Sequence, residues 1–175
     1  MKKIVCILSL MILVSASFAA NKDWTNGSGD RNFARGSNWF DTLDTYNWVS
    51  TDAPRINMSG TNAPILNSNV VCGSMVLGYI ANGTGELNIT GGTNTFINGT
   101  FAGTAATITG IMNVSGGTTT FSGYFTVGNT GTGILNVSDG ILNLNRSQLC
   151  QVAGSQGAYN ISGGQINIVT NLTVG

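Results

Sequence analysis

Hydrophobic and polar residues alternate with a period of two in short segments that recur along the C-terminal two thirds of the chain. The clearest segment, Gly131–Gly140, has the sequence Gly-Thr-Gly-Ile-Leu-Asn-Val-Ser-Asp-Gly. Its central asparagine has equivalents at successive steps of 25, 23 and 24 residues: Asn88, Asn113, Asn136 and Asn160. Because a strand directs alternate side chains to opposite faces, the apolar neighbours of each asparagine point inward and the asparagine points outward. The pattern predicts stacked, equivalent strands with an outer asparagine ladder.

Two further apolar segments follow the asparagine strand in each period, separated from it by glycine-containing turns. The inward residues predicted for the second strand are Phe96, Phe121, Leu144 and Ile168. Those predicted for the third strand are Met75 and Leu77, Phe125 and Val127, Cys150 and Val152, and Leu172 and Val174. Coils stacked at a strand spacing of about 4.8 Å align these positions into one core. We therefore predict an all-β, right-handed parallel β-helix (β-solenoid) with about 24 residues and three short strands per coil.

Three residues interrupt this pattern. Phe101 is out of phase with the inward positions of the third strand in its coil. Asn94 and Thr119 fall at inward positions of the second strand, where later coils have Leu142 and Ile166. We expect a β-bulge or a looser corner at this part of the solenoid.

The first residues of the chain have the pattern of a secretory signal peptide, residues 1–19. Lys2 and Lys3 form a positive start, and an apolar run that is too short to cross a bilayer comfortably follows them. Small residues at Ser17 and Ala19 predict cleavage after Ala19, with Ala20 as the near alternative. We expect a secreted protein, extracellular or on a bacterial cell envelope, with no membrane span after removal of this leader.

Residues 20–66 have a different composition, without the repeat. They contain the three tryptophans of the chain, Trp24, Trp39 and Trp48, and most of its charged residues. Large aromatic side chains bury much area and suit an N-terminal cap over the first coil of a solenoid. An alternative is a glycan-binding patch, in which the same three tryptophans stack on sugar rings. We place the domain boundaries at 1–19 for the signal peptide, 20–66 for the cap and 67–175 for the repeats.

Composition and charge narrow the classes of function. Only 8% of the residues are charged, and without Lys2 and Lys3 the chain has five basic residues against seven acidic ones. This balance makes nucleic acid an improbable partner. Histidine is absent, and Glu86 and Asp139 fall at different repeat positions in different coils, so neither a histidine-based site nor a facing pair of carboxylates is expected. We predict no enzyme activity, no metal and no cofactor.

Two cysteines follow the leader, Cys72 and Cys150. The repeat register places them about three coils, or roughly 14 Å, apart, whereas a disulfide needs Cα atoms within about 7 Å. We therefore predict two unpaired thiols, with Cys150 in the core. Intermolecular pairing through Cys72 is the alternative.

Several phrases resemble the repeat units of large secreted bacterial proteins. LNITGGTNTF, MNVSGGTTTFSGYFTVGNTGTG and ILNVSDGILNL are similar to autotransporter-associated β-strand repeats and to surface proteins of the PEP-CTERM type. The Asn-Trp pairs at Asn38-Trp39 and Asn47-Trp48 resemble the start of such proteins. The resemblance implies an extracellular or envelope-associated structural role and supplies no catalytic residues.

The sequence thus favours a secreted or cell-surface structural protein of the stalk, matrix or adhesin type. The alternative is a carbohydrate-binding module that uses Trp24, Trp39 and Trp48. No capping sequence follows the last repeat, and an uncovered strand edge attracts other strands. We expect a truncated chain with further coils, a partner, or self-association at this end, and surface glycans are the other expected partner.

Overall fold

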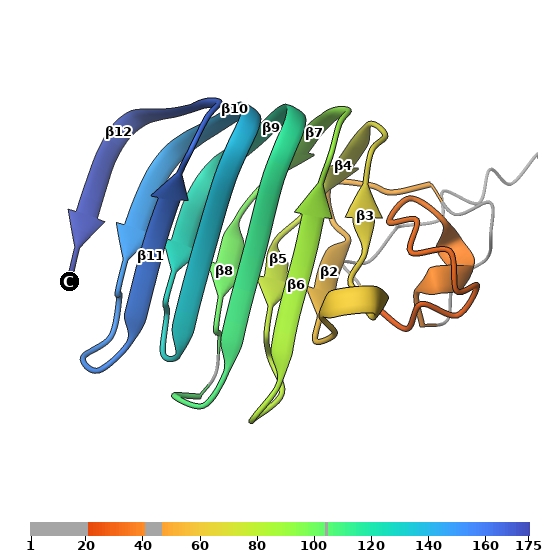
Figure 1. The fold of residues 1–175 in the computed structure, drawn as a ribbon, viewed down its shortest axis with the longest axis horizontal. Coiled ribbons are helices and arrows are strands. Elements are labelled where there is room, and N and C mark those ends of the chain that lie inside the picture. Colours follow the sequence, from red (N-terminus) through yellow and green to blue (C-terminus); the bar gives the residue numbers. More distant parts are fainter. Residues whose placement is uncertain (1–20, 41–46, 104) are drawn as a thin grey trace, which may run out of the picture.

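The computed structural model describes residues 21–40, 47–103 and 105–175. Its strands form one 12-stranded parallel sheet that is wound into a β-solenoid of about five turns with a spacing of roughly 24 residues. With the C-terminus at the left of Figure 1, the chain ascends on the near side and descends on the far side, which is a right-handed coil. The predicted fold class is confirmed, whereas the predicted signal peptide lies outside the described residues.

Strands and short 3₁₀ turns alternate along the chain. In chain order they are β1 (Asn21–Asp23), η1 (Gly36–Asn38), β2 (Ala53–Ile56), η2 (Gly60–Asn62), β3 (Ile65–Leu66), β4 (Val70–Cys72), β5 (Met75–Leu77), β6 (Thr84–Ile89), β7 (Thr93–Phe96), β8 (Gly99–Phe101), β9 (Thr109–Val127), β10 (Thr132–Leu149), β11 (Gln156–Ile161) and β12 (Gln165–Val174). We number the coils 1 to 5: β3–β5, β6–β8, β9, β10 and β11–β12.

Each coil has a first, a second and a third face, which correspond to the three predicted strands. In coils 3 and 4 one continuous strand runs through all three faces, whereas coil 2 divides into β6, β7 and β8. Asn88, Asn113, Asn136 and Asn160 stand in register on the first face, as the repeat predicts. The glycine corners between faces bend the chain and let each coil return above the previous one.

The region between residues 20 and 66 shares the sheet with the repeats. Strand β1 pairs with β2, and β2 pairs with β5, so the third face extends beyond coil 1 towards the N-terminus. Strand β3 pairs with β6 on the first face. Trp24, Phe33, Trp39 and Trp48 of this region pack at the same end of the core, where Phe33 contacts Phe96 edge to face at a centroid distance of 6.4 Å.

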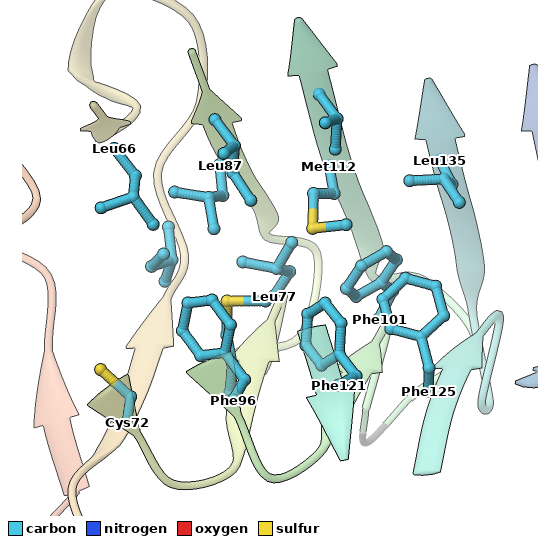
Figure 2. Packing of buried hydrophobic residues seen from close by; sticks show 14 of the residues in the cluster. Leu66, Cys72, Leu77, Leu87, Phe96, Phe101, Met112, Phe121, Phe125 and Leu135 are labelled. Carbon is cyan, nitrogen blue, oxygen red and sulfur yellow. The ribbon is translucent and has the colours of Figure 1, made fainter. Parts of the chain in front are cut away.

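The core consists of columns of equivalent inward residues from successive coils (Figure 2). On the first face Leu87, Met112 and Leu135 form one fully buried column. On the second face Phe96 and Phe121 stack at a centroid distance of 5.2 Å with an interplanar angle of 18°. Each such side chain contributes about 1.5–3 kcal/mol by leaving water, so the interior of the coils stabilises the fold along its whole length.

The structure corrects the prediction that Phe101 is out of phase. Phe101 pairs with Val127, is fully buried and occupies the same inward column as Leu77. The third strand of coil 2 begins one residue earlier than the sequence pattern suggested, with Gly99 opposite Phe125. A glycine suits this inward position because the rings of Phe121 and Phe125 fill the adjacent space.

The predicted inward pair Cys150 and Val152 is also wrong. Ser147 and Leu149 occupy the inward positions of the third strand in coil 4, where they pair with Phe125 and Val127. Cys150 follows the strand in a turn with a φ of 59°, and Val152 is 45% exposed. Ser147 is tolerated inside because its hydroxyl bonds to the hydroxyl of Tyr159.

Asn94 and Thr119 lie at inward positions as predicted, and both are fully buried. Residues Thr93 to Phe96 pair with the next coil without a shift. The expected irregularity lies at the corner that follows, where the pairing of β9 with β10 shifts between Leu144 and Arg146. The amide nitrogen of Asn94 donates to the carbonyl of Gly91 at 3.1 Å and to the hydroxyl of Thr119 at 3.4 Å. These hydrogen bonds hold two polar residues inside a regular column.

Candidate functional site

Trp24 and Trp39, two of the three predicted glycan-stacking residues, are buried against each other. Their rings meet edge to face at a centroid distance of 5.0 Å. The indole nitrogen of Trp24 donates to the carbonyl of Asn62 at 2.7 Å, and that of Trp39 donates to the carbonyl of Phe33 at 2.8 Å. These two tryptophans therefore act as packing residues at the N-terminal end of the core.

Trp48 belongs to the same cluster but is only partly buried. Its ring lies 4.8 Å from Trp39 and 5.2 Å from Phe33 between centroids. It also borders a surface depression of about 360 Å³ together with Ala34, Asn47, Asn69, Val70, Val71 and Thr93. The structure thus brings the three tryptophans together, and only Trp48 borders this depression. Glycan stacking stays a prediction, and among the three tryptophans Trp48 is the one whose position at the surface suits it.

Asp30 organises the loop between β1 and η1. One of its oxygens accepts hydrogen bonds from the amide of Asn38 at 2.6 Å, from the hydroxyl of Ser28 at 2.8 Å and from the backbone N–H of Asn32 at 3.0 Å. The other forms an ion pair with Arg35 at 2.8 Å. The guanidinium of Arg35, followed by these donors, holds the pKa of Asp30 well below its usual range. Residues of the same loop therefore supply all these hydrogen-bonding and ionic partners of the Asp30 carboxylate.

The two carboxylates of the repeats also have structural partners. Glu86 accepts from the backbone N–H of Gly60 at 2.9 Å and from the amide of Asn113 at 3.0 Å, which ties η2 to the first face. Asp139 accepts from the backbone N–H of Gly140 at 2.7 Å, at an irregular position within β10. Within the described ranges no three His, Cys, Asp or Glu side chains gather to hold a metal ion.

The outer asparagine ladder is present and continuous. The amide of Asn113 donates to the side-chain oxygen of Asn88 at 2.9 Å, Asn136 donates to Asn113 at 2.7 Å, and Asn160 donates to Asn136 at 2.8 Å. On the second face Asn167 donates to Asn143 at 2.8 Å. Side-chain hydrogen bonds thus connect successive coils outside the backbone sheet.

Both cysteines outside the leader are free thiols, as predicted. Cys72 is fully buried beneath the second face, and this burial raises the pKa of its thiol far above the ordinary value. Cys150 is partly exposed at the turn after β10 and does not belong to the core. Its predicted core position followed from the incorrect register of the third strand.

The sequence reasoning missed a depression of about 480 Å³ on the outer side of the third face. We call it the Tyr124 groove and define it by its lining residues: Ser74, Asn98, Thr100, Tyr124, Thr126, Gln148 and Gln151. Tyr124 is 47% exposed, and the guanidinium of Arg146 donates to its hydroxyl at 2.7 Å. The sequence feature that could have indicated this groove is the outward-facing Tyr124, which is followed one coil later by Arg146.

The last coil borders a further depression of about 500 Å³ between β10 and β11, lined by Asn136, Val137, Ser138, Tyr159, Asn160, Ile161 and Ser162. In the described part of the chain, no strand pairs with the outer edge of β11 or β12. Ile161 and Val174, which continue two inward columns, are 57% and 65% exposed for this reason.

Comparisons with known proteins identified no similar protein. No family model matches the chain, and no curated protein and no solved structure matches it either. A search of the described residues for a helix of sufficient length and apolar character to traverse a bilayer found none.

Proposed function

We propose that the chain is a structural element of a secreted or cell-surface protein, a stalk or adhesin-type spacer that performs no catalysis. The observation that carries this proposal is the unbroken stack of parallel coils, whose inward columns and outer ladders repeat from one coil to the next. In such a solenoid each coil stabilises its neighbours, and the length grows by about 4.8 Å per coil. This architecture suits a rigid spacer.

Export is the first part of the proposal, and the leader supports it. The full chain, produced in a bacterium, should appear outside the cytoplasm with its N-terminus at Ala20 or Asn21. A matched variant with Leu10→Arg and Leu13→Arg, which interrupts the apolar run, should stay inside with its leader attached. Retention of the unaltered chain in the cytoplasm, with Met1 still present, would contradict the proposal.

Self-association through the last coil is the second part. The exposed edge of β11 and β12 offers backbone hydrogen-bonding groups next to uncovered apolar residues, which favours pairing with another strand. At the opposite end of the core, the aromatic cluster of Trp24, Phe33 and Trp39 covers the first coils. A second copy is therefore expected to meet the first through the same surface, as a two-fold dimer.

Sedimentation velocity of the purified protein tests this association. We expect a concentration-dependent dimer, and Leu172→Lys with Val174→Lys should make it monomeric, because two buried charges per copy would oppose the contact. Ile97→Lys, at an exposed apolar residue far from the last coil, is the matched control. A monomer at all concentrations, or a dimer that survives the double substitution, would exclude this surface.

A further inference from the structure

The Tyr124 groove combines an exposed aromatic ring with polar groups on a face where charged residues are scarce. Tyr124 projects from the part of β9 that forms the third face, and nearly half of it is accessible to solvent. The face of an aromatic ring carries partial negative charge and attracts weakly positive C–H groups. One face of a pyranose ring consists of such C–H groups, so an exposed tyrosine beside hydrogen-bonding groups suits a sugar.

The groove is held in place before any ligand arrives. The backbone N–H of Tyr124 donates to the side-chain oxygen of Asn98 at 2.7 Å, and the amide of Asn98 donates to the hydroxyl of Ser74 at 2.9 Å. The guanidinium of Arg146 lies 5.3 Å from the centroid of the tyrosine ring. These contacts join coils 1 to 4 and reduce the entropy that binding would otherwise cost.

Two glutamines supply hydrogen-bonding groups that the protein leaves unused. Gln148 accepts a hydrogen bond from the hydroxyl of Thr126 at 3.2 Å, and this contact orients its amide. Within the described part of the chain, the amide nitrogen of Gln148 and the side chain of Gln151 have no hydrogen-bond partner, although both residues line the groove. Primary amides pair with sugar hydroxyls, because each side can donate and accept.

Arg146 is not one of the lining residues, but it brings a positive charge to the edge of the groove through its contact with Tyr124. The ion pairs found among the described residues, Arg35 with Asp30 and Arg55 with Asp23, both lie outside it, so Arg146 has no carboxylate partner. The two acidic residues of the repeats have other partners: Glu86 accepts from Gly60 and Asn113, and Asp139 accepts from the backbone N–H of Gly140. The guanidinium uses one donor on Tyr124 and retains others, which match the geometry of a carboxylate.

We propose that the Tyr124 groove binds an acidic polysaccharide. A pyranose ring stacks on Tyr124, the carboxylate of a uronic acid pairs with Arg146, and the amides of Gln148 and Gln151 bind ring hydroxyls. The sugar chain follows the outer side of the third face. This site differs from the tryptophan cluster in the cap, and it does not depend on the proposed structural role.

The experiment measures binding of the purified protein to polygalacturonate by isothermal titration calorimetry. Two matched polymers separate the contributions: fully methyl-esterified polygalacturonate retains the sugar rings without the charge, and dextran sulfate carries negative charge without carboxylates. We expect binding to polygalacturonate, at least about tenfold weaker binding to the ester, and weak binding to dextran sulfate, because the guanidinium–carboxylate pair is charged and specific in geometry.

The variants identify the residues responsible. Arg146→Gln and Tyr124→Ala should each weaken binding by about tenfold or more, a change of about 1.4 kcal/mol. Phe40→Ala, which removes an exposed aromatic ring in the cap, should leave binding unchanged. Thermal unfolding must show that each variant is folded, and Tyr124→Phe, which keeps the ring, should retain most of the affinity.

Three outcomes would overturn the proposal. The absence of binding to polygalacturonate excludes an acidic sugar ligand of this type. Equal binding to dextran sulfate shows a non-specific charge effect. Loss of binding in Trp48→Ala, with full binding in Tyr124→Ala, places the site in the cap.

Discussion

Gly99 lies opposite Phe125 in the neighbouring coil, and the rings of Phe125 and Phe121 together fill the place that a side chain at residue 99 would take. A Cβ atom added at residue 99 would lie 2.7 Å from the ring of Phe121 and 3.1 Å from that of Phe125. The two rings are packed 4.6 Å apart between centroids, and both are fully buried. The glycine is therefore part of the core packing, although it has no side chain.

Gly99→Ala should lower the free energy of unfolding by about 1–3 kcal/mol, because the added methyl group would force two fully buried rings to shift. Gly91→Ala is the matched control, since its nearest atom would lie at 3.5 Å, an ordinary contact distance. Urea unfolding measures both. Equal stability of the two variants would show that the rings of Phe121 and Phe125 adjust without cost.

Cys150 occupies a turn position that glycine fills in coils 1 and 3 and that Ala102 fills in coil 2. Its φ of 59° is in the left-handed region, as are the φ of Gly78 at 73° and that of Gly128 at 76°. Because left-handed backbone costs an ordinary residue about 1–2 kcal/mol, Cys150→Gly should raise the free energy of unfolding by up to about 1 kcal/mol after the entropy of glycine is considered. Cys150→Ala, which keeps the Cβ atom, should give no gain. A gain of the same size in both variants would assign the effect to the thiol.

Asn94 and Thr119 form a polar pair in an otherwise apolar column that includes Val70 and Leu142. The side-chain oxygen of Asn94 is buried without a hydrogen-bond partner. Replacing both residues by valine should stabilise the protein by about 1–3 kcal/mol, because the cost of a buried unsatisfied group disappears.

Thr119→Val alone should destabilise the protein, because it removes an acceptor from the buried amide of Asn94. Thr120→Val, at the adjacent outward position, serves as the control. Urea unfolding of the two single variants and the double variant forms a cycle. A double variant less stable than the unaltered protein would show that the pair is favourable as it stands.

The two free thiols should differ in reactivity. Cys72 is fully buried, and because burial raises its pKa, almost no thiolate is available at neutral or mildly alkaline pH. Alkylation of the native protein at pH 8, followed by peptide mass spectrometry, should therefore modify Cys150 and leave Cys72 intact. Both should react after denaturation in urea. Modification of native Cys72 at the rate of Cys150 would mean that coil 1 opens readily.

Asp30 should make the free energy of unfolding depend on pH in the acidic range. Its pKa is lower in the folded protein than in the unfolded chain, chiefly because of Arg35, so its contribution is complete above the unfolded value and is lost as the pH falls towards the folded value. The stability difference between the protein and its Asp30→Asn variant should be constant above about pH 5 and shrink below about pH 4. If the stability difference persists unchanged at low pH, the contribution of Asp30 comes from its hydrogen-bond geometry rather than from its charge.

The period of about 24 residues and the register of the first face follow from the sequence alone. Alternation around Asn88, Asn113 and Asn136 is a local property of a strand, and it specifies which residues point inward whatever the neighbouring coils contain. The outer asparagine ladder follows from the same register. These features were predicted correctly because each depends on spacing along the chain.

The register of the third face was decided only by the tertiary structure. The last inward residue of the second strand and the first inward residue of the third are separated by a step that varies between coils. The step is three positions from Phe96 to Gly99 and from Leu144 to Ser147, but four from Phe121 to Phe125. A local apolar pattern cannot detect a corner that changes length by one residue. At these inward positions Gly99 leaves room for the rings of Phe121 and Phe125, and Ser147 bonds to the hydroxyl of Tyr159, so both depend on residues of other coils.

The Tyr124 groove likewise exists only in the folded chain. Asn98, Tyr124 and Gln148 are separated from one another by more than 20 residues, and the stacking of coils brings them to one surface. Tryptophan content directed the sequence-based expectation to the cap, where packing buries Trp24 and Trp39. The sequence thus determined the repeat and its inward positions, because strand alternation is local. The tertiary structure decided which aromatic side chains remain exposed, because burial depends on contacts between coils.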